Sequence, residues 1–223
     1  MGSEMCIRDR LRRKWKKEGM KRILDLGCGT GRHLVYLAKK GFEAYGIDIA
    51  EEGIKIARKW LEKENLRADL KVGDIYKTLP YKDGFFDAVI CIRTLNHGKI
   101  EWIRKAIKEM HRILKPNGYV FVAVHKHKGK KHIPKEKLYE IKWIAPRTYV
   151  MLNGPEKGIP HYRFNKKILI KELKQAGFKN LRFSNQHNPR DFTASCKILI
   201  VLLILCCLVK STSTVFSIVD TYF

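Results

Sequence analysis

Short apolar runs alternate with amphipathic segments along the first 125 residues of the chain. The apolar runs are too short for helices and end at a glycine or an acidic residue, which is typical of buried strands. We expect strands at Arg22–Leu26, Glu43–Ile47, Asp69–Val72, Asp87–Ile92 and Tyr119–Val124. The fourth of these, DAVICI, is apolar on both faces, as a central parallel strand should be.

The segments between these runs repeat apolar residues at helical spacing. Leu34 and Leu37 share one face of the first segment, and Ile54 and Leu61 share one face of the second. We expect helices at Arg32–Lys40, Glu51–Glu64 and Ile100–Leu114, the last followed by a turn at Pro116-Asn117-Gly118. Strands alternating with helices predict a doubly wound α/β fold, with a mostly parallel sheet covered by helices on both faces.

The carboxyl ends of these strands are expected to meet at one edge of the sheet, because crossover connections are right-handed. The features that follow the strands there are the glycine turn 27–31, Asp48, Asp74 and the loop 93–98. We therefore expect all four to face a single crevice.

The pattern loosens after Val124. Residues 125–163 are basic and interrupted by proline and glycine, and we expect them to form a cap over the crevice. We expect a helix at Asn165–Ala176, with Asn165 as its N-cap, and closing strands at Lys179–Ser184 and Ser195–Leu203. Residues 11–205 are thus expected to form one domain.

Both ends of the chain differ from this domain. Residues 1–10 have no periodicity and are expected to be a leader foreign to the fold, and residues 206–223 are expected to be an artefactual tail. The longest apolar run, Ile198–Val209, has 12 residues, whereas a membrane span needs about 20. The 6 cysteines form no C-x-x-C pair. These features favour a cytoplasmic protein with reduced thiols and no membrane partner.

The chain is strongly basic, with 46 Lys and Arg against 22 acidic residues and a net charge of +24. Positive charge of this size favours contact with a phosphate backbone. The segment Arg10–Arg22 around Trp15 and the lysines of 126–135 are candidates for RNA contacts. A solvated basic surface explains the same residues, and both interpretations stay open.

The turn after the first strand, ILDLGCGTG at Ile23–Gly31, has glycine at every second position. Glycine lets the backbone approach a ligand closely and adopt positive φ. A dinucleotide site would have glycine or alanine where Arg32 stands, and the lysine of a phosphate-binding P-loop is absent. Asp25 beside the turn would repel a phosphate and attract an ammonium group.

Carboxylates after the next two strands extend this ligand pattern. Asp48 can accept both hydroxyls of a ribose, and Asp74 can accept from the exocyclic amine of a purine. An adenosine with a cationic, amino-acid-like end satisfies Asp25, Asp48 and Asp74 together. S-adenosylmethionine matches this description, and its product after methyl loss is S-adenosylhomocysteine.

Five motifs in order resemble those of class I S-adenosylmethionine-dependent methyltransferases, and the resemblance covers about Lys21–Val124. The motifs are ILDLGCGTG, GIDIA at Gly46–Ala50, GDI at Gly73–Ile75, FDAVICI, and LKPNGYVFV at Leu114–Val122. The resemblance implies a Rossmann-like methyltransferase fold with a mostly parallel seven-stranded sheet and one antiparallel strand. It implies cofactor contacts at Asp25, Gly27, Cys28, Gly29, Thr30, Gly31, Asp48, Ile49, Asp74, Ile75 and Ile92.

The resemblance also implies that the loop after the fourth strand, IRTLNHG at Ile92–Gly98, faces the transferred methyl group. This loop lacks the N/D-P-P-Y motif of enzymes that methylate amino groups and the Pro-Cys of C5-cytosine enzymes. His97 is therefore the candidate base, and His161 in GIPHY is a second candidate that the cap would supply. A packing role for each histidine is the alternative.

We expect no metal. His125, His127 and His132 have H-x-H spacing, but lysines surround them and no carboxylate lies immediately beside them.

The sequence leaves three functions open. The first is methyl transfer from S-adenosylmethionine to an oxygen, nitrogen or sulfur atom of a small molecule. The second is tRNA methylation, because DAVICIRTLNH is similar to a stretch of wobble-uridine carboxymethyl methyltransferases, which carry a histidine pair where this chain has Asn96-His97. The third is a non-catalytic basic binding module on the same scaffold.

Overall fold

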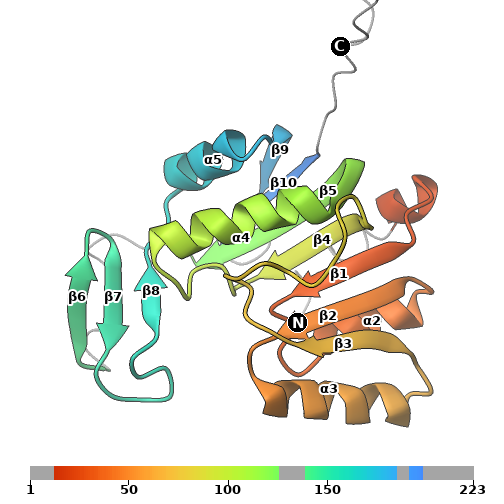
Figure 1. The fold of residues 1–223 in the computed structure, drawn as a ribbon, viewed down its shortest axis with the longest axis horizontal. Coiled ribbons are helices and arrows are strands. Elements are labelled where there is room, and N and C mark those ends of the chain that lie inside the picture. The colour runs from red at the N-terminus through yellow and green to blue at the C-terminus, as the bar shows by residue number, and fades with distance from the viewer. Residues whose placement is uncertain (1–12, 126–138, 185–190, 198–223) are drawn as a thin grey trace, which may run out of the picture.

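The main sheet of the protein lies between two layers of helices (Figure 1). The computed structural model describes residues 13–125, 139–184 and 191–197. The strand order is β3-β2-β1-β4-β5-β10-β9; all neighbours up to β5 pair in parallel, and β10 is antiparallel to both β5 and β9. The strands are β1 (Arg22–Leu26), β2 (Glu43–Asp48), β3 (Ala68–Val72), β4 (Phe86–Ile92), β5 (Leu114–His125), β9 (Lys179–Ser184) and β10 (Asp191–Lys197).

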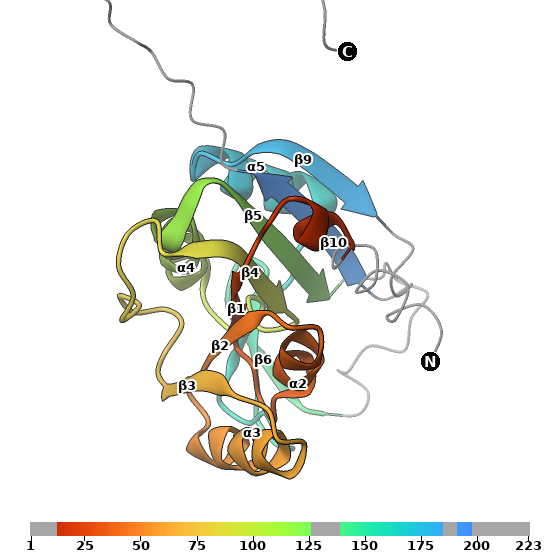
Figure 2. The ribbon, with the colours of Figure 1, turned by 90° about the vertical axis from the view of Figure 1, so that its right-hand side faces the viewer.

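The central strands are buried on both faces because successive side chains point to opposite sides of the sheet. In β1, Ile23 packs into one hydrophobic cluster while Leu24 and Leu26 pack into the other. The first cluster includes residues of α2 (Arg32–Lys39) and α3 (Glu51–Lys63), and the second includes residues of α4 (Ile100–Ile113) and α5 (Lys166–Gln175). Figure 2 shows the sheet between these two layers, which confirms the expected doubly wound, mostly parallel α/β fold.

A second sheet leaves the main domain between β5 and α5. Its strands β6 (Ile141–Ala145), β7 (Thr148–Met151) and β8 (Pro160–Tyr162) pair antiparallel. The Tyr162 N–H donates to the Asn96 carbonyl at 2.8 Å, which ties this small sheet to the loop after β4. The small sheet stands beside the ends of the main strands (Figure 1). The cap expected at 125–163 stays a prediction, since residues 126–138 lie outside the described part.

Two predicted boundaries were wrong. Strand β5 begins at Leu114 and includes the residues expected to turn. Asn117 has a φ of 61°, and the pairing with β4 shifts register between Phe86 and Ala88, so the expected turn is an irregularity within the strand. Strand β10 begins at Asp191, four residues before the predicted start. The helix N-cap was right: Asn165 Oδ1 accepts from the Ile168 N–H at 2.8 Å.

Trp15 belongs to the core. Its side chain is 3% exposed and packs edge-to-face on Phe42 and Tyr119, at centroid distances of 6.3 and 6.1 Å. It therefore offers no open ring for stacking on an RNA base. The lysines of 126–135, the leader 1–10 and the tail 206–223 lie outside the described residues. Within the described residues, no helix combines the length and apolar character that crossing a membrane requires.

Candidate active site

The glycine turn joins β1 to α2 and is held against the end of β2. The backbone N–H groups of Gly27 and Cys28 donate to the Ile47 carbonyl at 2.8 and 3.1 Å. Thr94, in the loop after β4, donates from Oγ1 to the Gly27 carbonyl at 3.3 Å. The turn is thus fixed from both neighbouring strands before any ligand binds.

Gly27 and Gly29 both have positive φ but face different surroundings. A Cβ at Gly27 would lie 2.2 Å from Thr94 Cγ2, so this position has no room for a side chain. A Cβ at Gly29 would meet no described atom within 4 Å. The backbone at Gly29 therefore borders open space, where a ligand can approach it closely.

Asp25 is an acid buried at the end of β1, with 1% of its surface exposed. Among the described residues, neither carboxylate oxygen has a hydrogen-bond partner. His33 Nδ1 lies 3.6 Å from Asp25 Oδ2, an ion pair only when the imidazole is protonated. A buried carboxylate without a donor is costly, so a cationic group of a ligand would stabilise this site.

Asp48 is fixed at the end of β2 by two backbone donors. Its Oδ2 accepts from the Gly29 N–H at 2.8 Å and its Oδ1 accepts from the Ala50 N–H at 2.9 Å. Each oxygen keeps a lone pair for a further donor, such as a ribose hydroxyl. The next residue, Ile49, is 69% exposed and offers an apolar contact for a purine ring.

Asp74 and Ile75 form the turn after β3. Asp74 Oδ1 accepts from the Tyr76 N–H at 2.9 Å, and the Gly73 N–H donates to the Asp48 carbonyl at 2.9 Å. Ile75 is 5% exposed and packs in the core, so its predicted contact with the cofactor stays a prediction. Burial raises the pKa of Tyr76 well above its ordinary value, so the phenol stays protonated.

The remaining predicted cofactor contacts differ in exposure. The Cys28 side chain is buried under the turn, where burial and then the nearby Asp25 charge raise its thiol pKa. Thr30 is exposed, and Ile92 is half-buried at the end of β4. Asp25, Asp48 and Ile92 nevertheless stand at the carboxyl ends of three neighbouring strands. The fold thus gathers these residues at one edge, and their contacts with a cofactor stay predictions.

Both predicted catalytic histidines come together at this edge, although 64 positions separate them in the chain. The rings of His97 and His161 have centroids 5.0 Å apart and planes at 74°. His161 is 4% exposed and stacks on Tyr149 at 5.1 Å. Strand β8 supplies His161, and the loop after β4 supplies His97.

Glu156 contacts both histidines, and the sequence analysis did not predict it as a site residue. Its Oε2 lies 3.0 Å from His161 Nε2, and its Oε1 lies 3.8 Å from His97 Nε2. Glu156 comes from the loop between β7 and β8, and no spacing motif marks it. The ligand atoms of these three residues all lie within 4.8 Å of one another, close enough to hold a metal ion.

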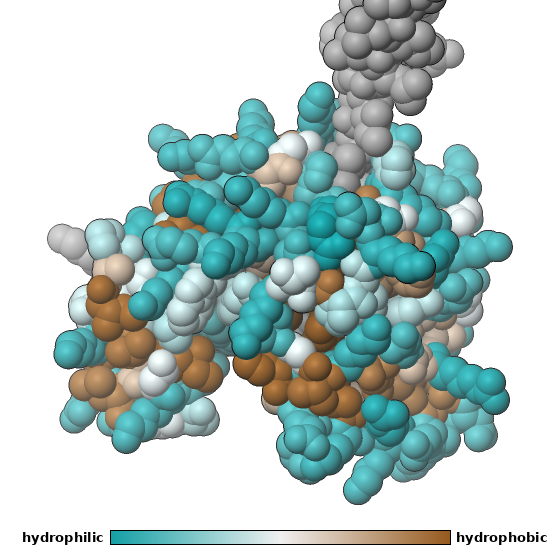
Figure 3. All heavy atoms as spheres, in the orientation of Figure 1, coloured by the Kyte–Doolittle hydropathy of each residue, from teal (hydrophilic) through white to brown (hydrophobic). Residues whose placement is uncertain are grey.

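The surface between the two sheets is hollowed. Figure 3 shows a notch between the small sheet and the lower part of the main domain, with hydrophobic residues on both parts. Ile49 and Val72 are exposed at the ends of β2 and β3, and Trp143, Leu152 and Ile159 are exposed on the small sheet and its loop. A notch of this kind at the carboxyl edge of the strands suits an organic substrate.

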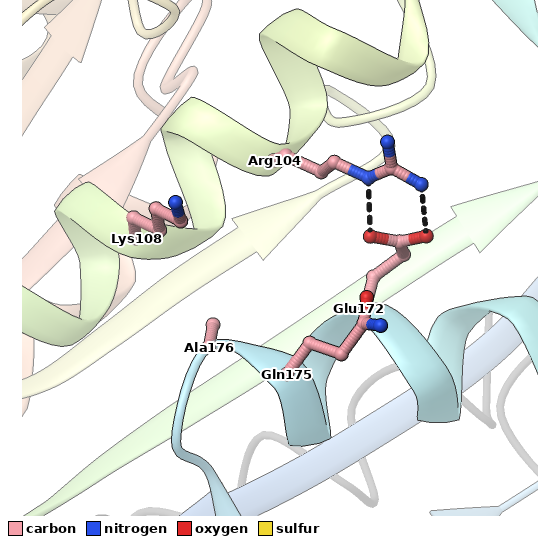
Figure 4. Close-up of a pocket in the computed structure, with 5 residues that line it drawn as sticks. All are labelled: Arg104, Lys108, Glu172, Gln175 and Ala176. Atoms are coloured by element: carbon pink, nitrogen blue, oxygen red, sulfur yellow. Dashed lines mark hydrogen bonds and ion pairs between the residues drawn. The ribbon is translucent and has the colours of Figure 1, made fainter.

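A second hollow lies between α4 and α5 and is lined by Arg104, Lys108, Glu172, Gln175 and Ala176 (Figure 4). Arg104 spans it with a bidentate pair to Glu172, at 2.8 and 3.1 Å. The Glu172 side chain is 4% exposed, so the pair neutralises a buried acid. The Arg104–Glu172 ion pair joins α4 to α5 across this hollow. None of the predicted site residues lines it.

Comparisons with known proteins agree with this geometry. The family described as "Methyltransferase domain" matches residues 23–118. A norajmaline N-methyltransferase from Rauvolfia serpentina is 34% identical over 112 residues, which cover 49% of this chain and 37% of that protein. A ubiquinone biosynthesis O-methyltransferase from Xanthomonas oryzae pv. oryzae is 32% identical over 102 residues, covering 46% and 42%. The match spans about four tenths of the length of these curated relatives.

The fold has solved counterparts as well. A crystal structure of an S-adenosylmethionine-dependent methyltransferase from Methanosarcina mazei superimposes with a TM-score of 0.67 at 25% identity, covering 81% of this chain and 93% of that one. Residues 23–118 are therefore a methyltransferase domain of the class I, S-adenosylmethionine-dependent type.

Proposed function

We propose that the protein transfers a methyl group from S-adenosylmethionine to an oxygen, nitrogen or sulfur atom of a small molecule. One observation carries this proposal: Asp25 is a buried carboxylate without a described donor, beside a glycine turn that borders open space. The ammonium of the cofactor is the donor that this site lacks. Asp48 and Asp74, after the next two strands, would accept hydrogen bonds from its ribose and adenine.

The residues of the chain act mainly by alignment. The acceptor's lone pair attacks the methyl carbon while the carbon–sulfur bond breaks. The electrons of the broken bond stay on sulfur, so the sulfonium becomes a neutral thioether. Such a displacement needs proximity and orientation more than acid catalysis. The fixed Asp48 and the rigid turn at Gly27 hold the donor side. His97, in the loop fastened to both sheets, takes the proton of an acceptor that carries one.

The acceptor class follows from the notch and from the relatives. The N- and O-methyltransferases described above bear names that place their acceptors among small organic molecules or their precursors. The exposed apolar side chains at the notch suit an apolar acceptor. Support for tRNA methylation is limited to the net charge and to the likeness of DAVICIRTLNH to wobble-uridine enzymes, because the buried Trp15 offers no ring for stacking on a base. Support for a non-catalytic binding module would require loss of cofactor binding.

Calorimetric titration with S-adenosylmethionine and S-adenosylhomocysteine tests the cofactor. A panel of small O, N and S acceptors, with bulk tRNA at two salt concentrations beside it, tests the acceptor by mass spectrometry. We expect micromolar cofactor binding and a mass gain of one methyl group on a small molecule. His97→Ala should lower turnover and spare cofactor affinity. Methylation of tRNA alone would replace the small-molecule proposal, and absence of cofactor binding by the folded chain would refute it.

A further inference from the structure

In the cluster of His97, Glu156 and His161, two contacts of the His161 ring define which of its nitrogens carries the hydrogen. His161 Nδ1 lies 2.7 Å from the Ile159 carbonyl. A carbonyl oxygen only accepts, so Nδ1 carries the hydrogen and donates it. The neutral ring then presents the lone pair of Nε2 toward Glu156 Oε2, 3.0 Å away. Two lone pairs at this distance repel each other unless a cation lies between them.

Either a proton or a metal ion can supply that positive charge. The presence of His97 beside Glu156 and His161 favours the metal ion. His97 brings a second imidazole, with its Nε2 3.8 Å from Glu156 Oε1. A proton bridges only two atoms, whereas a divalent cation binds one atom from each of the three residues. The ligand atoms of the three residues lie within 4.8 Å of one another, which allows one ion to contact all of them.

We infer that His97, Glu156 and His161 form a binding site for a divalent transition-metal cation of the zinc class. Two imidazole nitrogens and one carboxylate are a ligand set that Zn²⁺ takes in open sites, where a fourth position stays free for water or substrate. Tetrahedral ligands about 2.1 Å from the ion lie about 3.4 Å apart. The distances of 3.0 and 3.8 Å bracket this value. Hard cations such as Mg²⁺ prefer all-oxygen sites.

The surroundings of His161 match those of a metal ligand. A ligating histidine usually donates its other ring N–H to a carbonyl or carboxylate, which fixes the ring orientation. The Ile159 carbonyl plays this part, and the stacked Tyr149 ring holds the imidazole plane. The Tyr162 N–H to Asn96 carbonyl bond at 2.8 Å fastens the two ligand-bearing segments together.

The position of the site suggests a catalytic role for the ion, and this role rests on the proposed function. The loop that carries His97 also carries Thr94, which contacts the glycine turn. With His97 bound to the ion, a Lewis acid there would replace the free His97 base: it would bind an acceptor oxygen and lower its pKa, so that the acceptor reacts as an oxyanion. The acceptor would then be a hydroxyl compound. Metal binding itself does not depend on this role.

Titration of the chelator-treated full chain with Zn²⁺ tests the inference directly. We expect one ion per chain, with affinity lowered at least tenfold by His97→Gln and by Glu156→Gln. Glu140→Gln, a matched change at an exposed glutamate beside β6, should leave the affinity unchanged. Co²⁺ should give the visible spectrum of nitrogen and oxygen ligands without a thiolate band, which excludes the cysteines as the source of binding.

Zn²⁺ binding that both variants retain would overturn the inference, as would no binding at all. Each variant is titrated with S-adenosylhomocysteine in parallel, which reports that it is folded. A chain that binds S-adenosylhomocysteine and not Zn²⁺ refutes the metal site alone. A chain that binds Zn²⁺ at these residues and not S-adenosylhomocysteine supports the metal site and refutes the proposed function.

Discussion

The backbone N–H of Gly29 donates a 2.8 Å hydrogen bond to Asp48 Oδ2. This bond joins the glycine turn after β1 to the acid at the end of β2, two features that sequence analysis assigned to different parts of one ligand. The carboxylate that is expected to bind the ribose therefore also shapes the turn beside it. Changes at either residue should alter both halves of the cofactor site.

Asp48→Ala is expected to weaken S-adenosylhomocysteine binding by about 2–4 kcal/mol, because it removes two charge-assisted acceptors. Calorimetry gives the affinity, and circular dichroism checks that the variant is folded. Glu62→Ala, on the exposed side of α3, is the control and should bind normally. Unchanged affinity in Asp48→Ala would show that the ribose binds elsewhere.

Alanine at Gly27 should mainly lower stability, whereas alanine at Gly29 should mainly lower cofactor affinity. Gly27→Ala clashes with Thr94 and should lower the free energy of unfolding by about 2–3 kcal/mol, from overpacking and left-handed backbone. Gly29→Ala has open space and should lose only about 1 kcal/mol, while its new methyl group obstructs cofactor binding. Urea unfolding and calorimetry separate the two effects.

Gly19→Ala is the matched control for this pair. Gly19 has a φ of 68° and no described atom near a Cβ, so it measures the backbone cost alone. Equal stability losses at Gly27 and Gly19 would contradict the contact with Thr94.

Asp25→Asn should separate stability from binding. The amide removes a buried charge without a described donor, so the thermal midpoint of the ligand-free protein should stay level or rise. Affinity for S-adenosylmethionine should fall at least tenfold, because the amide no longer attracts the ammonium group. A lowered midpoint with normal affinity would make Asp25 a structural residue that binds no cofactor. Thermal scans with and without cofactor provide both readings.

Glu109 should contribute to acid sensitivity. Hydrogen bonds from Arg112, and a further one from the Leu79 N–H, hold the pKa of its carboxyl below the ordinary value of 4.5. A lowered folded pKa stabilises the protein above pH 4.5, and this stability is lost as the pH falls below 4.5 toward the folded pKa. Glu109→Gln should therefore show a shallower fall in unfolding free energy over that window. A pH series of urea unfolding measures this slope, and an unchanged slope would contradict the assignment.

The strands and helices up to Ile113 were predicted within about one residue, because sequence and tertiary structure favour the same elements there. Central parallel strands such as DAVICI are buried on both faces and end at marked turns. The three acids Asp25, Asp48 and Asp74 follow those strands, so their common edge could be predicted from topology alone.

The small sheet and its contribution to the site could not be predicted in this way. Strands β6 and β8 are short, and the exposed Trp143 and Ile144 break the alternation that marks a half-buried strand. Glu156 reaches the histidines through a loop whose path depends on how the small sheet docks. The expectation that the chain has no metal was based on His125, His127 and His132, whereas the observed cluster combines the loop after β4 with the distant segment 156–161.

The place of β10 in the sheet has a consequence for synthesis on the ribosome. β10 is later in the chain than β9, yet it lies between β5 and β9 and pairs with His125–Tyr119 along seven residues. Until Asp191–Lys197 has left the exit tunnel, β5 presents an unpaired edge and β9 has no partner. The unpaired backbone edge of β5 is prone to aggregation until β10 pairs with it. We therefore expect chaperones to bind the nascent chain most strongly just before β10 emerges.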